Sequence, residues 1–180
     1  KIREKSVSKL MVIDKEFSFK NNQSSSNWEQ NVIIILGLMR ILNIKIKNII
    51  PSIMKLTPIE GRGKKFQITH EKKSFTLIDE SYNSSPESLA KAIEHLKNVK
   101  FKHTRKICVI GDMLELGKMS KSCHLKIVEN LLNTKPDIIL TVGKHSYTIF
   151  EKLPENFLKF HFKNYKNVFD KLLSIIENND

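Results

Sequence analysis

Residues 106–117 read KICVIGDMLELG, an apolar run that stops at a glycine and continues into a polar loop. Continuous apolar residues are typical of a strand buried on both faces, as in parallel sheets covered by helices. A second run, residues 138–140, has the same character. The two runs predict an α/β fold with a Rossmann-like, mostly parallel sheet and flanking helices.

Strand and helix patterns alternate around these runs, as expected when helices connect parallel strands. We expect strands at 75–79, 106–110, 137–142 and 157–162, and helices at 86–97, 121–132, 145–152 and 168–177. Ser85 and Pro86 predict the first helix start, because serine caps a helix and proline fits its first turn. Ligands of such sheets usually bind beyond the carboxyl ends of the strands, so we expect any chemistry in the loops after 79, 110 and 142.

The first 60 residues have a different character. We expect a strand or hairpin arm at 10–19, a polar loop at 21–26, and helices at 28–42 and 46–55. The first of these helices is apolar on several faces, and the residues before it offer little surface to bury it. Thr57, Pro58, Gly61 and Gly63 then mark a domain boundary near residue 60. We therefore expect a partial α/β segment at 1–60 and a second domain at 61–180.

Composition narrows the function classes. The net charge is +12, and a basic chain can neutralise nucleic-acid phosphates. However, only four of the 31 basic residues are arginine, the side chain that reads bases and phosphates in a bidentate way. A basic nucleic-acid-associated protein is therefore the less favoured alternative. The two cysteines lack zinc spacing, and no apolar run reaches the roughly 18 residues of a membrane helix, so we expect neither zinc nor membrane insertion.

The loop at 79–86, DESYNSSP, is the first candidate site. Asp79 can accept hydrogen bonds from ribose hydroxyls, and Tyr82 and Asn83 can pack against a base. The start of the following helix can hold negative charge. The alternative is an ordinary capped turn between a strand and a helix.

The loop at 111–117, GDMLELG, is the second candidate. It has neither the GxGxxG nor the GxxxxGK[ST] pattern, so it does not predict dinucleotide or Walker-type phosphate binding. Asp112 and Glu115 can serve a cation or the amine of a substrate. Alternatively, Leu114 and Leu116 pack the loop while the acids face water. A histidine such as His124 is more often a surface or hydrogen-bonded residue than a catalyst.

Taken together, these segments resemble one family. GRG at 61–63, DESYNSSP at 79–86, and GDMLELG at 111–117 with Ser120 and His124 downstream are similar in order and spacing to the motifs of the D-alanyl-D-alanine-adding Mur ligases. NWEQN at 27–31, before an apolar helix, resembles the segment that closes the central domain of that family. The resemblance covers roughly residues 27–180.

The resemblance implies a cytoplasmic bacterial ligase of peptidoglycan synthesis that uses ATP and Mg²⁺. Such an enzyme joins D-Ala-D-Ala to a UDP-N-acetylmuramoyl tripeptide through an acyl phosphate, and its carboxyl-terminal domain closes over the nucleotide. From the matching positions in the family, the resemblance implies that Arg62 approaches the ATP phosphates and that Asp79 approaches the ribose. Tyr82 and Asn83 lie near the adenine.

The resemblance also implies which residues lie near the dipeptide substrate. The loop residues expected near the incoming D-Ala-D-Ala are Asp112, Met113, Leu114 and Glu115. The resemblance implies no metal ligand and no residue that performs the chemistry itself within this sequence.

The departures from the family matter as much as the matches. The Walker loop, the central-domain carboxylate and lysine, and the UDP-binding domain are absent from this sequence, and Asn27 stands where the family typically has histidine. After 178–180 the family continues into a strand with a Lys-Gly-Ser motif and a last helix. We therefore expect 1–60 to be a remnant of the ATP-binding central domain, and 61–180 to be the carboxyl-terminal domain without its last strand and helix. We expect such a chain to be inactive alone, and a non-catalytic nucleotide or small-ligand binding module is the alternative.

Overall fold

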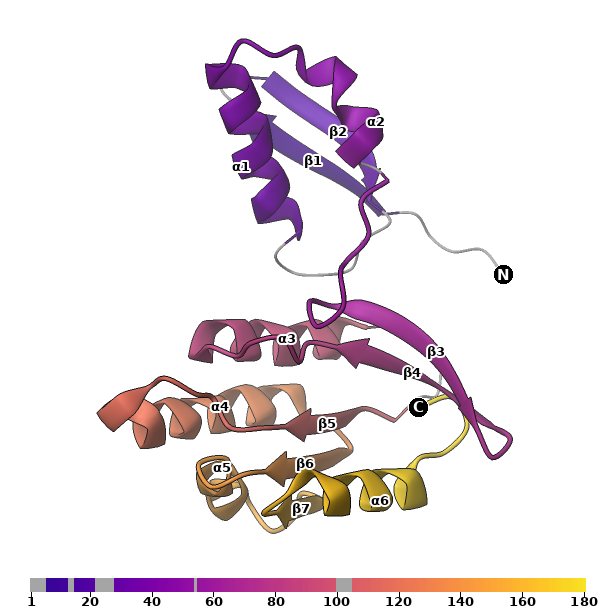
Figure 1. Ribbon diagram of the computed structural model, residues 1–180, viewed down its shortest axis with the longest axis vertical. Coiled ribbons are helices and arrows are strands. Elements are labelled where there is room, and N and C mark those ends of the chain that lie inside the picture. Colours follow the sequence, from indigo (N-terminus) through magenta and orange to yellow (C-terminus); the bar gives the residue numbers. More distant parts are fainter. Residues whose placement is uncertain (1–5, 13–14, 22–27, 54, 100–104) are drawn as a thin grey trace.

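The computed structural model describes residues 6–12, 15–21, 28–53, 55–99 and 105–180. Figure 1 shows two parts joined by the chain around residues 55–60. The elements of the first part are β1 (Ser6–Val12), β2 (Lys15–Asn21), α1 (Trp28–Ile41), a 3-10 turn (Ile46–Asn48) and α2 (Ile50–Ile53). Those of the second are β3 (Lys64–His70), β4 (Lys73–Asp79), α3 (Pro86–Asn98), β5 (Ile107–Ile110), a 3-10 turn (Gly117–Met119), α4 (Ser120–Thr134), β6 (Ile138–Val142), α5 (Tyr147–Lys152), β7 (Lys159–Phe162) and α6 (Tyr165–Ile175).

The first part is a hairpin with two helices. β1 and β2 pair in antiparallel fashion, so the stretch 10–19, expected to be a single strand or hairpin arm, instead contains parts of two strands. The loop expected at 21–26 lies, apart from its first residue, outside the described residues. Val32 and Leu36 of α1 are buried with Ile53, whereas Ile34 and Ile41 on the same helix are exposed. The expected helix is therefore present, but it buries only part of its apolar surface.

The second part is built on a parallel sheet in the order β5-β6-β7. Cys108 of β5 lies opposite Ile139 of β6, and Leu140 of β6 lies opposite Phe160 of β7. This confirms the parallel sheet with flanking helices that the apolar runs predict. β6 is central, and this explains why its first four residues are all buried.

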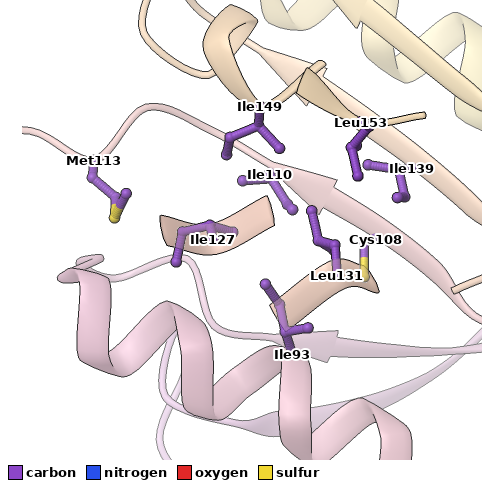
Figure 2. Packing of buried hydrophobic residues seen from close by; sticks show 9 residues of the cluster. All are labelled: Ile93, Cys108, Ile110, Met113, Ile127, Leu131, Ile139, Ile149 and Leu153. Atoms are coloured by element: carbon purple, nitrogen blue, oxygen red, sulfur yellow. The ribbon is translucent and has the colours of Figure 1, made fainter. Parts of the chain in front are cut away.

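Helices cover both faces of this sheet. Ile139 points into a cluster with α3, α4 and α5, whereas Ile138 and Leu140 point to the opposite face, where they pack against Val168 of α6. Figure 2 shows the larger cluster, in which Met113 lies at one end, beyond Ile110 and Ile127. The members of that cluster are Ile93, Cys108, Ile110, Met113, Ile127, Leu131, Ile139, Ile149 and Leu153.

The strand β3 is a finding that the sequence patterns did not predict. It forms an antiparallel hairpin with β4, and within the described residues β4 is not hydrogen-bonded to the parallel sheet. The hairpin turn consists of Glu71 and Lys72, both with positive φ. Such turns are usually recognised by asparagine or glycine, and this one has neither, so its sequence carries no turn signal.

Residues near 180 tie the hairpin to the sheet. The backbone N–H of Asn179 donates to the carbonyl of Ser74 at 2.6 Å, and that of Thr76 donates to the carbonyl of Asp180 at 2.8 Å. Arg105, which precedes β5, donates to both carboxylate oxygens of Asp180. This bidentate contact joins the start of β5 to the segment that lies along β4.

The helix α6 begins three residues before the expected position. The side chain of Asn164 accepts a hydrogen bond from the backbone N–H of Asn167 and caps the helix there. Asparagine is among the preferred capping residues, so the signal was present in the sequence. No helix within the described ranges is long and apolar enough to cross a bilayer.

The strands β4, β5 and β6 point in the same direction in Figure 1. The loops that follow them therefore open at the same edge of the molecule. This is the edge at which the sequence patterns place both candidate sites.

Candidate functional site

The first group of candidate residues forms where the turn at 61–63 meets the loop after β4. The backbone N–H of Gly61 donates to Oδ2 of Asp79 at 2.8 Å, and the N–H of Gly63 donates to the carbonyl of Asp79 at 2.7 Å. The N–H of Tyr82 in turn donates to the carbonyl of Gly61 at 3.2 Å. Two segments that are about 18 residues apart in sequence are thereby held together.

Glycine is required at position 61 for two reasons. Its φ of +75° lies in the left-handed region, where other residues are strained. In addition, a Cβ atom there would lie 2.6 Å from Cβ of Tyr82 and 2.9 Å from its backbone nitrogen. The close approach of the two segments therefore depends on this glycine.

Arg62 projects from the same turn. Its guanidinium carbon lies 4.5 Å from the centre of the Tyr82 ring, and both side chains are exposed. A cation–π contact of this kind is worth about 0.5–1 kcal/mol at an exposed site. No carboxylate pairs with Arg62 among the residues that the structure describes, so its charge is available to an anionic ligand.

Asp79 is held in its charged form. Its pKa is lowered chiefly by the Ser81 hydroxyl, which donates to Oδ1 at 2.6 Å. Burial opposes this effect, but the backbone N–H groups of Gly61 and Ser81 and the charge of Lys64 lower the pKa further. An ionised carboxylate that is only partly buried can accept hydrogen bonds from the hydroxyls of a sugar. The neighbouring Glu80 has a raised pKa because of its burial and the nearby charge of Asp79.

Asn83 and the start of α3 make local contacts. Oδ1 of Asn83 accepts from the N–H of Ser84 at 2.8 Å. Ser85 and Ser88 cap the helix reciprocally: each hydroxyl accepts a hydrogen bond from the backbone N–H of the other residue. The helix start predicted from Ser85 and Pro86 is confirmed, and its capping serines occupy two of the N–H groups that an anion would otherwise bind.

The second group is centred on Asp112, in the loop after β5. Its Oδ1 accepts from the backbone N–H groups of His145 and Ser146 at 3.0 and 2.7 Å, and its Oδ2 accepts from that of Lys144 at 2.9 Å. Gly143, with φ +117°, makes room for the carboxylate, because a Cβ atom there would lie 2.4 Å from Oδ1. Asp112 therefore fastens the loop after β5 to the loop after β6.

These hydrogen bonds determine the charge state of Asp112. Burial alone would raise its pKa, but the hydrogen bonds from Ser146, His145 and Lys144 together outweigh burial and lower the pKa. The carboxylate is thus ionised, and its charge is largely satisfied by backbone donors of its own chain.

The rest of this loop divides into buried and exposed side chains. Met113 is 1% exposed and belongs to the main core cluster, and Leu116 packs against the same cluster. Leu114 is 70% exposed, so the alternative expectation that it packs the loop is wrong. Glu115 is exposed and has a φ of +61°. The tip of the loop therefore presents Leu114 and Glu115 to the outside.

Two features of this site had weak signals in the sequence. The backbone N–H groups of 144–146 cannot be recognised from residue types, although Gly143 directly after a strand indicates an unusual backbone. His124 is fully buried and hydrogen-bonded to Met113, which agrees with the expectation of a hydrogen-bonded residue. Among the described residues there is no group of three or more His, Cys, Asp or Glu side chains that could hold a metal ion.

The chain matches a known protein family. Residues 65–180 match the model of the Mur ligase, glutamate ligase domain. Among curated proteins, the chain is 32% identical over 144 residues to the UDP-N-acetylmuramoyl-tripeptide--D-alanyl-D-alanine ligase of Rickettsia prowazekii, which covers 78% of this chain and 31% of that protein. It is 28% identical over 123 residues to the enzyme of the same name from Bacillus subtilis, with 68% of this chain and 27% of that protein covered.

Solved structures share the fold. The MurF ligase of Thermotoga maritima in complex with ADP superposes with a TM-score of 0.78 at 22% identity, covering 100% of this chain and 39% of that one. A MurF structure from Acinetobacter baumannii gives a TM-score of 0.79 at 20% identity, covering 96% of this chain and 36% of that one. The chain spans about a third of the length of the relatives it matches.

Proposed function

The chain belongs to the Mur ligase family, and from this premise we propose that it serves the ATP-dependent joining of D-Ala-D-Ala to a UDP-N-acetylmuramoyl tripeptide. The curated relatives with this reaction in their names support the proposal. The reaction belongs to peptidoglycan synthesis, and we place it in the bacterial cytoplasm. We expect residues 1–60 to belong to the ATP-binding central domain of such an enzyme.

The first group of residues fits a nucleotide. Arg62 has no acidic partner among the described residues, and its guanidinium can pair with phosphate oxygens. The ionised Asp79 carboxylate can accept hydrogen bonds from ribose hydroxyls. The Tyr82 ring, 69% exposed, and the Asn83 amide offer packing and hydrogen bonding to an adenine. The junction of 61–63 with 79–82 carries the proposal, because it brings a cation, a carboxylate and a ring together.

The second group is proposed for the dipeptide. The loop residues concerned are Asp112, Met113, Leu114 and Glu115. Glu115 is exposed and carries a negative charge that can attract the amino group of D-Ala-D-Ala, while Leu114 offers apolar contact to its methyl groups. Asp112 and Met113 contribute from inside the loop, since the first is bonded to 144–146 and the second is buried.

Bound ATP, with Mg²⁺, would supply the phosphoryl group that activates a substrate carboxyl group. The part of this chain is to bind and orient. Arg62 is an exposed residue of the turn that precedes β3, where it can stabilise charge on a phosphoryl group when the two parts close on each other. We assign no residue of this chain to Mg²⁺. We expect the 180 residues to bind ligands without joining them, because the sequence contains no GxxxxGK[ST] loop to grip the phosphates.

Isothermal titration of the chain with ATP and magnesium chloride tests the nucleotide site. We expect saturable binding that Arg62→Ala weakens about tenfold, the value of one lost charge-assisted contact. Arg40→Ala is the matched control, because Arg40 is an exposed arginine in the last turn of α1. The control should bind ATP within about twofold of the unchanged protein.

Two results would contradict the proposal. Absence of saturable binding would remove the nucleotide site. Equal weakening by Arg62→Ala and Arg40→Ala would mean that ATP is attracted only by the net charge of +12. A chain that binds ATP and D-Ala-D-Ala but joins nothing even inside a complete ligase would instead favour the alternative, a non-catalytic binding module.

A further inference from the structure

His124 is buried beneath the loop that follows β5. The ring is 0% exposed and lies in α4, four residues after Ser120. Its Nε2 accepts a hydrogen bond from the backbone N–H of Met113 at 3.0 Å. Its Nδ1 lies 2.7 Å from the carbonyl oxygen of Ser120 and 3.5 Å from the hydroxyl of the same residue.

These partners specify one form of the ring. A backbone N–H can only donate, so Nε2 must carry a lone pair toward Met113. A carbonyl oxygen can only accept, so Nδ1 must carry the proton toward Ser120. His124 is therefore neutral and protonated at Nδ1. The other tautomer and the cation would each place an N–H of the ring against the N–H of Met113.

The hydrogen bond to Met113 holds the centre of the loop. The Met113 side chain is anchored in the core cluster, and the preceding Asp112 is bonded to the backbone of 144–146. With these two residues fixed, the next two project outward: Leu114 is 70% exposed, and Glu115 turns the chain with a φ of +61°. His124 thus acts on the exposed tip through Met113 without reaching it.

We propose that His124 is a positioning residue for the dipeptide site, which as the neutral Nδ1–H tautomer holds the loop so that Leu114 and Glu115 meet the ligand. This inference rests on the proposed function, because it assigns the ligand of the tip to that reaction. It also narrows the site: Leu114 and Glu115 contact the dipeptide, whereas Asp112, Met113 and His124 determine where those two side chains lie.

Two substitutions separate this role from simple core filling. In His124→Gln, the side-chain amide oxygen can take the place of Nε2 and accept from Met113. In His124→Leu, the volume is kept but no acceptor remains, and a buried N–H without a partner is unfavourable. Ile127→Val is the matched control, because Ile127 is equally buried in α4 and belongs to the cluster that Met113 joins.

The test uses nuclear magnetic resonance of the 180-residue chain. The ¹⁵N shifts of the His124 ring should show Nδ1 protonated and Nε2 bare, and the Met113 amide should exchange slowly with solvent. His124→Leu should speed that exchange at least about tenfold, and His124→Gln should keep it within about threefold. Titration with D-Ala-D-Ala should shift the Leu114 and Glu115 amides, with an affinity that is weakened about tenfold in His124→Leu and retained in His124→Gln and Ile127→Val.

Each outcome has a clear meaning. A ring protonated at Nε2, or unchanged Met113 exchange in His124→Leu, would overturn the loop-holding role. If His124→Leu and Ile127→Val lose the same affinity for D-Ala-D-Ala, His124 contributes only by filling the core. If the unchanged chain does not bind D-Ala-D-Ala, the proposed dipeptide site fails together with the ligand-positioning role. The ring shifts and the amide exchange would still show whether His124 holds the loop.

Discussion

The loops after β4 and β5 look alike in sequence, since each runs from a strand through polar residues to a helix, but they are held in different ways. The loop at 79–86 is held near the surface by the Ser81 hydroxyl and the capping serines, and also by the turn at 61–63, in which both glycines are buried. The loop at 111–117 is held from inside, by the Met113 side chain, the His124 ring and the backbone of 144–146. The first arrangement depends on hydrogen bonds and places little of the loop in the apolar core, whereas the second ties the loop to the stability of the core.

Gly143→Ala should have the largest effect on stability, because the added methyl group would clash with the Asp112 carboxylate that fastens the loop. The new Cβ would lie 2.4 Å from Oδ1 of Asp112, and the φ of +117° is unfavourable for alanine. Backbone strain and lost hydrogen bonds should together lower the free energy of unfolding by about 4 kcal/mol, measured by urea denaturation. Gly111→Ala is the control: nothing lies within 4 Å of its added Cβ, and it should change stability by less than about 1 kcal/mol. Similar values for the two variants would refute the role of Asp112 as a fastening group.

Met113→Ala should be next, because it removes a side chain that is 1% exposed from the core. We expect a loss of about 3 kcal/mol from the lost transfer energy and the cavity, compared with less than about 1.5 kcal/mol for Met113→Leu. Tyr82→Ala in the other loop should cost at most about 1 kcal/mol, since that ring is 69% exposed. Thermal and urea unfolding of the three variants would show whether only the loop at 111–117 is coupled to the core. A loss of stability in Tyr82→Ala as large as that in Met113→Ala would contradict this difference between the two loops.

Acid should distinguish the two carboxylates. The pKa values of Asp79 and Asp112 are both lowered in the folded state, so their stabilisation is complete above the unfolded value of about 3.9 and is lost as the pH falls through the folded pKa. Asp112→Asn should lower the free energy of unfolding by about 2 kcal/mol at pH 7 and flatten its decline below pH 4. Asp79→Asn should flatten that decline less, because the Asp79 carboxylate is less buried than that of Asp112 and water screens its charge more. The measurement is urea unfolding at a series of pH values. If the free energy of unfolding of Asp112→Asn falls below pH 4 as steeply as that of the unchanged protein, the ionised Asp112 carboxylate does not stabilise the fold.

Ser85→Ala should have the smallest effect, because it removes one exposed cap. The Ser85 hydroxyl accepts from the backbone N–H of Ser88 at 3.2 Å, and losing such a cap typically costs about 1 kcal/mol. Ser85→Asp should restore the loss, because aspartate caps equally well. Ser84→Ala, on the same loop, should remain within about 0.5 kcal/mol of the unchanged protein. Calorimetric melting of the three variants would check this order.

Local patterns in the sequence determined much of the fold. Continuous apolar runs predicted β5 and β6, and Ser85 with Pro86 predicted the start of α3. Each of these signals is contained within a few neighbouring residues. The two loops could therefore be placed at the carboxyl ends of the strands before any tertiary contact was known.

The tertiary structure alone decided what holds each loop. β3 had no readable turn signal, and its pairing with β4 depends on the whole hairpin. The partners of Asp112 lie 32 to 34 residues further along the chain, and they are backbone groups that every residue type carries. Whether Met113 points inward and Leu114 outward depends on the space that α3, α4 and β5 leave between them. Periodicity reports which residues can be buried, whereas the packing of distant segments determines which of two adjacent apolar side chains is buried.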